Sequence, residues 1–368
     1  MIEAPEFIAA ARRLGYAFYA GVPCSLLKSF INRVIEDPEL TYVSAANEGD
    51  AVAACAGAYL GGVRGVAMMQ NSGLGNAISP LASLTDPFEI PVLLIVTLRG
   101  DPELKDEPQH DLMGRATPQL LETLEIPWTY FPTEASEIDP ALHAAHDGMT
   151  SSNRPFAFVM RRGSLAPGDE LDANTIVKAS SAAREIEACW RSQDRGPARS
   201  DVLRRIIERT AIDESLVLAA TGYTGRELSA LDDRANQLYM VGSMGCLSSL
   251  GLGLATTRPE RRTVLIDGDG ATLMRMGNLA TVGTYAGNNL VHFVLDNEVH
   301  DSTGGQATVS SAVSFAAAAK ACGYSYVIEG NDVAIVDRVL EEADSGSVDG
   351  PLFAHIKISP GTLESLPR

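Results

Sequence analysis

Residues 262–306 read RTVLIDGDGATLMRMGNLATVGTYAGNNLVHFVLDNEVHDSTGGQ, and two strand ends in this stretch decide the fold. The apolar run at 263–266 predicts a buried parallel strand that ends in Asp267-Gly268-Asp269-Gly270. A second strand at 290–295 ends in Asp296-Asn297. The segment between them predicts one helix, whose apolar face would carry Leu273, Met276, Leu279, Ala280 and Val282.

The two strand ends predict a site for a hard cation. Parallel strands end at the same edge of a sheet, so Asp269 and Asn297 are expected side by side, next to a helix N-terminus that suits a diphosphate. Oxygen ligands of this kind hold Mg²⁺, or another divalent cation such as Ca²⁺ or Mn²⁺, and the main-chain carbonyl of Val299 is a candidate third ligand. The alternative is an ordinary turn in which Asp269 only caps the helix.

Composition and charge narrow the classes of partner. The chain has 368 residues and a net charge of −18, which disfavours nucleic acid and anionic membranes as partners. The longest apolar run, residues 91–98, is too short to span a bilayer. Five scattered cysteines without a C-x-x-C motif indicate reduced, mostly buried thiols in a cytoplasmic protein. They are Cys24, Cys55, Cys189, Cys246 and Cys322.

Strand and helix patterns alternate through both halves of the chain. This rhythm predicts two α/β domains, each a doubly wound, mostly parallel sheet, over residues 1–165 and 201–368. Residues 166–200 are polar and predict a linker with one helix and no strand. In the first domain, a polar loop is expected from Arg99 to Met113, followed by a helix near 117–124.

Two more motifs lie at predicted strand ends. Gly242-Ser243-Met244-Gly245 precedes Asp269, and Met244 is either a core residue or a side chain that shapes a ligand site. Glu48 begins a predicted helix after the strand at 41–45. It is either a first-turn acid beside a cap formed by Asn47 and Asp50, or a catalytic carboxylate.

Together these motifs resemble thiamine-diphosphate enzymes, in which a Gly-Asp-Gly turn is followed, one helix and one strand later, by a pair of asparagines. The chain departs from this pattern only in that Asp296 replaces the first asparagine. The resemblance implies the thiamine-diphosphate-binding fold with pyrimidine and diphosphate domains and no central third domain. It implies a Glu48 contact with N1′ of the cofactor, and Met244 between its two rings. The other implied cofactor residues are Thr221, Gly222, Gly242, Gly245, Asp269, Gly270, Ala271, Asn297 and Val299.

Longer stretches resemble the phosphonopyruvate decarboxylase family, a relative of the sulfopyruvate decarboxylases. They include residues 21–27, 70–76, 99–101, 106–110, 222–228 and 295–306. The resemblance implies decarboxylation of 3-phosphonopyruvate, a small anionic 2-keto acid, to phosphonoacetaldehyde and CO₂ in phosphonate biosynthesis. It also implies a homo-oligomer, at least a dimer, with the active site at the subunit interface.

The substrate of such an enzyme carries two anionic groups, which need cations and hydrogen-bond donors. The candidates are Ser25, Asn71, Ser72, Arg99, Lys105 and His110. For Arg99 and Lys105 the alternative is surface charge on a mobile loop. His110 or His300 is a candidate for the proton transfer that follows loss of CO₂.

Three alternative functions stay open from the sequence. The first is sulfopyruvate decarboxylase, or another thiamine-diphosphate-dependent 2-keto acid decarboxylase or synthase. The second, a nucleotide-binding oxidoreductase, is disfavoured because residues 268–277 do not match G-x-G-x-x-G and no P-loop is present. The third is a non-catalytic binding protein that kept the fold.

Overall fold

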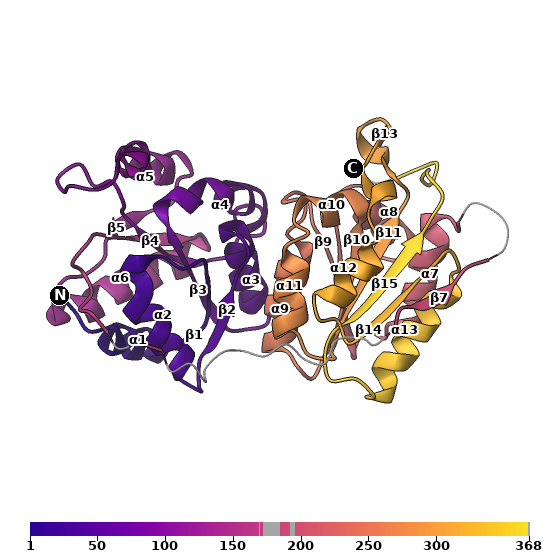
Figure 1. Cartoon of the computed structure of the whole chain (residues 1–368), viewed down its shortest axis with the longest axis horizontal. Helices are drawn as coiled ribbons and strands as arrows, with labels where there is room; N and C mark the ends of the chain where they lie inside the picture. The colour runs from indigo at the N-terminus through magenta and orange to yellow at the C-terminus, as the bar shows by residue number, and fades with distance from the viewer. Residues whose placement is uncertain (169, 172–184, 192–195, 367–368) are drawn as a thin grey trace. The chain divides into compact units, whose positions relative to one another are not determined.

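The computed structural model describes residues 1–168, 170–171, 185–191 and 196–366 (Figure 1). The chain divides into two units, Met1–Val177 and Lys178–Arg368, and each is described by itself. The division falls inside the segment expected to be a linker, and the helix expected there lies outside the described residues. One expectation for this segment was wrong, because Glu187–Cys189 forms strand β7, which pairs in parallel with strand β14.

The first unit contains a six-stranded sheet in the order β2-β1-β3-β4-β6-β5, and every pairing in it is parallel. The strands are β1 (Tyr16–Gly21), β2 (Thr41–Ser44), β3 (Arg64–Gln70), β4 (Leu93–Thr97), β5 (Trp128–Tyr130) and β6 (Phe156–Met160). All five residues of β4 are buried, as expected for a central strand covered on both faces.

Helices cover both faces of this sheet. They are α1 (Ala4–Arg13), α2 (Lys28–Glu36), α3 (Glu48–Leu60), α4 (Leu74–Pro80), α5 (Asp111–Thr123) and α6 (Ala135–Ser152). Helices α1, α2 and α6 enclose one core, in which the Phe7 ring stacks on Phe131 at 4.6 Å between centroids and meets Phe30 edge-on at 5.6 Å. Helices α3 and α4 pack together on the other face (Figure 1).

The second unit contains a seven-stranded, fully parallel sheet in the order β7-β14-β15-β11-β10-β8-β9. Its other strands are β8 (Ser215–Ala219), β9 (Gln237–Tyr239), β10 (Arg262–Gly268), β11 (Leu290–Asp296), β14 (Tyr326–Gly330) and β15 (Leu352–Lys357). Helices α7 (Arg199–Arg209), α8 (Tyr223–Leu231) and α13 (Ala334–Ser345) share one core with the sheet. Helices α9 (Leu247–Thr257), α11 (Asn278–Tyr285) and α12 (Phe315–Ala321) cover the other face.

The expectation of a single helix between β10 and β11 was wrong. Helix α10 (Asp269–Met274) ends where Arg275 leaves helical geometry, at φ −133° and ψ 43°, and α11 begins at Asn278. The Asn278 side chain is buried and donates a hydrogen bond to Ser248 Oγ in α9 at 2.8 Å, which fixes the start of α11. Leu279 and Val282 are buried as expected, whereas Met276 is 38% exposed and Ala280 is exposed.

The boundaries of α5 also differ from the expected ones. The helix begins at Asp111, inside the segment expected to be a loop, and Pro118 lies in its interior. Proline is typical of the first turn of a helix, which is why the sequence favoured a start near residue 117. A short antiparallel hairpin, β12 (Val299–His300) with β13 (Gln306–Ala307), was not expected. No described helix has the length and hydrophobicity needed to cross a lipid bilayer.

Candidate active site

The second unit has a cavity of about 300 Å³ at the carboxyl ends of β8, β10 and β11. Parallel strands present their C-terminal loops at this edge, so residues distant in sequence meet there. Its lining includes the predicted cofactor residues of this unit except Gly242 and Gly245, together with His300. The full lining is Arg199, Ala220, Thr221, Gly222, Tyr223, Thr224, Met244, Gly268, Asp269, Gly270, Ala271, Leu295, Asn297, Val299, His300, Asp301, Ser302 and Thr303.

Asp269 is a buried carboxylate at the start of α10, only 3% exposed. Burial raises its pKa; the negative charge of Asp296 adds to that effect, and the hydrogen bond from Thr308 opposes it. Thr308 Oγ1 donates this bond to Asp269 Oδ2 at 2.5 Å. The hairpin β12–β13 brings Thr308 back to Asp269, because Thr308 N donates to Glu298 O at 2.8 Å. No cationic side chain among the described residues hydrogen-bonds to Asp269, and a buried carboxylate of this kind suits a metal cation.

Asn297 follows β11 and is 6% exposed. Its Nδ2 donates to Asp301 Oδ2 at 2.6 Å, and its Oδ1 accepts a hydrogen bond from Val299 N at 3.3 Å. Glu298, between them, has a left-handed backbone (φ 64°), which turns the chain sharply after the strand. Asp269, Asn297 and Val299 therefore lie around one cavity, as the sequence predicted.

Met244 and His300 both approach the Gly270 backbone. A Cβ at Gly270 would lie 2.5 Å from His300 Cε1 and 3.3 Å from Met244 Cε, so a side chain there would displace the His300 ring. Met244 is partly exposed and lines the cavity, which disfavours its interpretation as a core residue. The residues beside it, Ser243 (φ 51°) and Gly245 (φ 89°), are both left-handed. Ser243 thus stores backbone strain next to the cavity.

In the first unit, Glu48 begins α3, but its side chain does not cap that helix. Asn47 is the N-cap and accepts a hydrogen bond from Gly49 N at 2.9 Å. The Glu48 carboxylate instead reaches α4, where Asn76 Nδ2 donates to Oε2 at 2.8 Å. Oε1 lies 2.1 Å from the position that a Cβ on Gly73 would take, so a side chain at Gly73 would displace the carboxylate. The cap and the half-buried Glu48 carboxylate are therefore separate features.

The predicted substrate residues of this unit lie on loops after β1, β3 and β4, the same edge of the sheet. Arg99 binds Asp106 through Nε (2.7 Å) and Nη2 (2.6 Å), and Nη2 also donates to Glu107. These bonds hold the pKa of Asp106 well below its usual range. His110 Nε2 lies 3.7 Å from Glu107 Oε2. Asp106, Glu107 and His110 are close enough together to suggest a metal site, but Arg99 already occupies both carboxylates.

The other predicted substrate residues differ in exposure. Asn71 is fully buried, and its Nδ2 donates to Arg99 O (2.8 Å) and Thr117 Oγ1 (3.1 Å) while its Oδ1 accepts from Arg99 N (3.2 Å). Its amide therefore holds the Arg99 backbone and the Thr117 hydroxyl. Ser25, Ser72 and Lys105 are exposed, and Ser72 Oγ accepts a hydrogen bond from Gln70.

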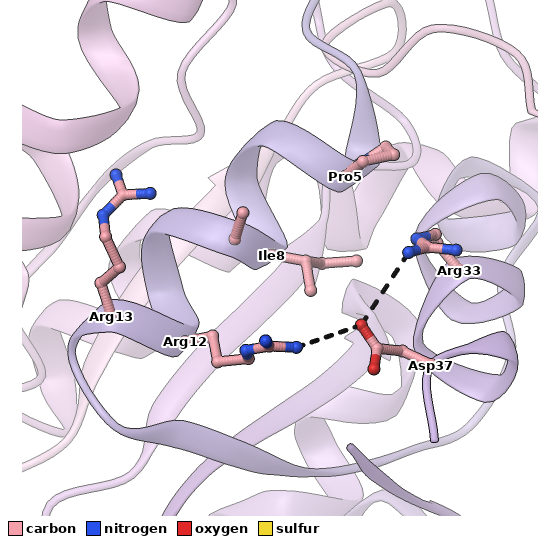
Figure 2. Close-up of a pocket in the computed structure, with 7 residues that line it drawn as sticks. Pro5, Ile8, Arg12, Arg13, Arg33 and Asp37 are labelled. Atoms are coloured by element: carbon pink, nitrogen blue, oxygen red, sulfur yellow. Dashed lines mark ion pairs between the residues drawn. The ribbon is translucent and has the colours of Figure 1, made fainter. Parts of the chain in front are cut away.

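A larger groove of about 470 Å³ lies between α1 and α2 (Figure 2). It contains none of the predicted site residues. Arg12 and Arg33 reach Asp37 at 3.5 and 3.9 Å, and Arg13 binds Asp139 at 2.7 Å. The acidic partners neutralise the charge of these arginines. Helices α1 and α2 end where β1 and β2 begin, so the groove lies at the opposite edge of the sheet from Glu48.

Comparison with known proteins agrees with this geometry. Residues 5–120 match the N-terminal TPP binding domain of thiamine pyrophosphate enzymes, and residues 228–356 match their C-terminal TPP binding domain. The chain is 44% identical to the phosphonopyruvate decarboxylase of Streptomyces viridochromogenes, over 100% of this chain and 91% of that protein. It therefore belongs to the phosphonopyruvate decarboxylase family of thiamine pyrophosphate enzymes.

More distant relatives place this family in context. The chain is 29% identical to the sulfopyruvate decarboxylase of Methanosarcina acetivorans, over 98% of this chain and 92% of that protein. The benzoylformate decarboxylase of Polynucleobacter necessarius shares the fold, with a TM-score of 0.76 at 12% identity over 99% of this chain and 100% of that one. These matches confirm the predicted fold class of two parallel α/β domains.

The cavity has the features that thiamine diphosphate, the cofactor of this family, requires. Gly222 is the N-cap of α8, with φ 97°, a conformation that favours glycine, and it lines the cavity with Thr221 and Tyr223 at the helix N-terminus. A diphosphate is negatively charged and needs a cation to neutralise it. Asp269 and Asn297 offer oxygen ligands for that cation. The donor set thus fits a diphosphate with a divalent cation.

Several cavity residues were not predicted from the sequence. Arg199 and Tyr223 line the cavity, and Thr308 binds Asp269. The Gly304-Gly305 turn before Thr308 was a usable signal for the hairpin. Asp301 and Ser302 were within the quoted stretch but had no assigned role. Nothing local in the sequence marks Arg199, which lies beside the expected linker boundary.

Asp296, the departure from the usual asparagine pair, points away from the cavity. It is fully buried and accepts hydrogen bonds from Ser310 Oγ (2.8 Å) and His355 Nε2 (2.9 Å), with Lys357 Nζ at 2.7 Å. Burial opposes ionisation, but these partners outweigh it and lower the pKa of Asp296 to about 2. Burial lowers the pKa of His355, but its hydrogen bond to Asp296 and the nearby Glu329 carboxylate, 3.8 Å from Nδ1, outweigh burial and raise that pKa. Asp296 therefore does not line the cavity, although its negative charge contributes to the raised pKa of Asp269.

Proposed function

We propose that this protein catalyses the non-oxidative decarboxylation of 3-phosphonopyruvate to phosphonoacetaldehyde and CO₂, with thiamine diphosphate and Mg²⁺. The observation that carries the proposal is the buried Asp269 beside Asn297 in one cavity of a chain of this family. Sulfopyruvate decarboxylase is the second candidate. It is less favoured because the identity falls from 44% to 29% between the two kinds of relative.

The second unit would hold the cofactor by its diphosphate. Asp269, Asn297 and the Val299 carbonyl would bind the divalent cation, and the backbone at Thr221, Gly222, Gly270 and Ala271 would contact the diphosphate. Met244, presented by the strained turn at 243–245, would support the cofactor rings, with Gly242 and Gly245 on either side. Bound thiamine diphosphate supplies an electron sink for the bond that breaks when CO₂ leaves.

Proton transfers would fall to this chain's own side chains. Glu48, half-buried and held by Asn76, would share a proton with N1′ of the cofactor. His300 lines the cavity against Gly270 and is the better placed of the two histidines to deliver the proton that completes the reaction. His110 faces Glu107 in the Arg99 loop, which suits it to substrate binding.

Arg99 would bind the phosphonate of the substrate. Its Nε and Nη2 are occupied by Asp106 and Glu107, whereas no hydrogen bond from Nη1 is found among the described residues. Asp106 and Glu107 in the loop therefore fix the guanidinium group of Arg99, and its Nη1 is the donor proposed for the phosphonate. Ser25, Ser72 and Lys105 lie at the same edge as exposed secondary candidates.

Arg99→Lys is expected to raise KM for phosphonopyruvate about ten- to a hundredfold, with a smaller effect on kcat, because a lysine lacks the planar guanidinium that binds Asp106 and Glu107 through Nε and Nη2 and keeps Nη1 for the phosphonate. This is the loss expected for one hydrogen bond to a charged group, about 1.5–3 kcal/mol. Steady-state kinetics measures it. Arg154→Lys, at an exposed ion pair with Asp86 and Glu125, is the matched control. Equal KM values for the two variants would contradict a role for Arg99 in substrate binding.

The function itself is tested by CO₂ and aldehyde release from phosphonopyruvate, sulfopyruvate and pyruvate, with and without thiamine diphosphate and Mg²⁺. Phosphonopyruvate is expected to be the preferred substrate, and turnover is expected to need both additions. No CO₂ from phosphonopyruvate under conditions that release it from sulfopyruvate would favour the second candidate.

We also propose that the active form is a cytoplasmic homo-oligomer, at least a dimer, in which Glu48 and Asp269 of one site come from different subunits. Mixing Glu48→Gln with Asp269→Asn protein tests this. Two inactive variants that regain activity on mixing support shared sites, whereas a fully active monomer would refute them.

A further inference from the structure

A network of buried charged side chains contacts Asn297 through Asp301. Arg199, the first residue of α7, is 6% exposed, and Glu227 in α8 is 1% exposed. Arg199 Nη1 donates to Glu227 Oε1 at 2.9 Å, and Nη2 donates to Asp301 Oδ2 at 2.9 Å. Nη1 also donates to Gly361 O at 3.0 Å. The arginine thus bridges two carboxylates through its two terminal nitrogens, a geometry that a lysine cannot reproduce.

Asp301 receives three donors at one oxygen. Oδ2 accepts from Asn297 Nδ2 (2.6 Å), Arg199 Nη2 (2.9 Å) and Gly361 N (3.1 Å). An ionised carboxylate can only accept hydrogen bonds, so it selects the NH₂ end of the Asn297 amide. The Val299 N–H selects the opposite end, because it donates to Oδ1. Both contacts require the same orientation of the Asn297 amide. In a flipped amide the oxygen would face the Asp301 carboxylate, another acceptor, and the NH₂ group would face the Val299 N–H, another donor.

This orientation matters because an amide binds a hard cation only through its oxygen. We propose that Asp301 and Arg199 are positioning residues, which hold the Asn297 amide so that Oδ1 is the atom presented to the divalent cation. The inference rests on the proposed function, since that function supplies the cation. The Arg199–Glu227–Asp301 network carries one net negative charge, which also favours a dication in the adjoining cavity.

Cation affinity tests the proposal directly, without turnover. The full chain is titrated with Mn²⁺ in the presence of thiamine diphosphate, and free Mn²⁺ is followed by electron paramagnetic resonance. Asp301→Ala and Arg199→Lys are each expected to weaken Mn²⁺ binding by about 10–100-fold, the usual cost of losing an outer-shell partner. Asp337→Ala is the matched control, because Asp337 binds Arg205 of the same helix α7 at 2.6 Å but does not line the cavity. Its Mn²⁺ affinity is expected to equal that of the wild type.

A double-mutant cycle separates positioning from a general structural role. If Asp301 acts through Asn297, Asp301→Ala should change Mn²⁺ affinity less than about threefold in an Asn297→Ala background, because the ligand that it orients is gone. Full additivity of the two substitutions would overturn the proposal, as would wild-type affinity in both Asp301→Ala and Arg199→Lys. If Asp301→Ala does not fold, judged by circular dichroism of the apo protein, a cycle of Arg199→Lys with Asn297→Ala takes its place and is read in the same way.

The same titration distinguishes this inference from the proposed function. Wild-type protein that binds no Mn²⁺ with thiamine diphosphate would overturn both. Wild-type protein that binds Mn²⁺ but releases no CO₂ from phosphonopyruvate would overturn the proposed function alone, and the variant affinities would still decide the roles of Asp301 and Arg199.

Discussion

Glu48→Gln is expected to lower kcat for phosphonopyruvate decarboxylation by about 10²–10⁴-fold, the usual contribution of a positioned acid–base group. Glutamine has the shape of glutamate, and its amide oxygen can still accept the hydrogen bond from Asn76 over Gly73. What it loses is the ability to share a proton with the cofactor ring. Binding of thiamine diphosphate is therefore expected to stay measurable while turnover collapses.

Steady-state kinetics, with calorimetric titration of thiamine diphosphate, checks both parts of this expectation. Glu6→Gln is the matched control, because Glu6 lies in the first turn of α1 and its side chain accepts a hydrogen bond from Glu3 N, which glutamine can also do. That variant should keep wild-type kcat. A Glu48→Gln enzyme with the kcat of the control would show that Glu48 is only a first-turn acid, the alternative that the sequence left open.

The regular parts of the fold could be predicted because short apolar runs ended in glycine turns. Helix α3 begins at Glu48, as expected, and strand β11, Leu290–Asp296, covers the predicted residues 290–295. Helix α6 was missed although its buried residues, Ile138, Leu142, Ala145 and Met149, have helical spacing. Pro140 inside that helix and the many small and polar residues between these positions concealed the pattern. Helix α13 was missed as well.

The cavity in the second unit could be predicted because its residues follow strand ends directly. Position in the chain says less about side-chain partners. Asn71 was a candidate for substrate binding, yet it is fully buried and holds the Arg99 backbone. Arg199 could not be found at all, since its partners Glu227 and Asp301 are 28 and 102 residues away along the chain. Such contacts depend on how helices α7 and α8 pack, and no local motif encodes that packing.

Asp269→Asn is expected to abolish cation-dependent binding of thiamine diphosphate and, with it, turnover. The loss of affinity should exceed about 100-fold, the upper range for an outer-shell residue, because a charged cation ligand is removed. Wild-type protein at a ligand concentration of about 100 times Kd should gain about 2.7 kcal/mol of unfolding free energy from the bound cofactor. At the same ligand concentration the variant should gain at most about 0.4 kcal/mol. Thermal unfolding with and without thiamine diphosphate and Mg²⁺ measures the difference.

Without ligand, the difference in unfolding free energy between wild type and Asp269→Asn should have the opposite sign. Burial raises the pKa of Asp269, so the native state binds its proton more tightly than the unfolded chain does. Apo wild type therefore loses stability as pH rises from the ordinary pKa of an aspartate through the raised value, and asparagine removes that titration. Apo Asp269→Asn should thus be more stable than apo wild type at pH 7, and the difference should vanish in acid.

Asp267→Asn provides the control for the stability gained from the cofactor. Asp267 is 1% exposed and lies two residues before Asp269, but it does not line the cavity. It binds Gly268 N at 3.0 Å. Its variant should keep the stability gained from thiamine diphosphate and Mg²⁺, whatever its effect on the apo protein. If Asp269→Asn keeps that gain too, Asp269 is not a cation ligand. An Asp269→Asn protein that is destabilised in both states would instead mark Asp269 as a structural residue of the turn after β10.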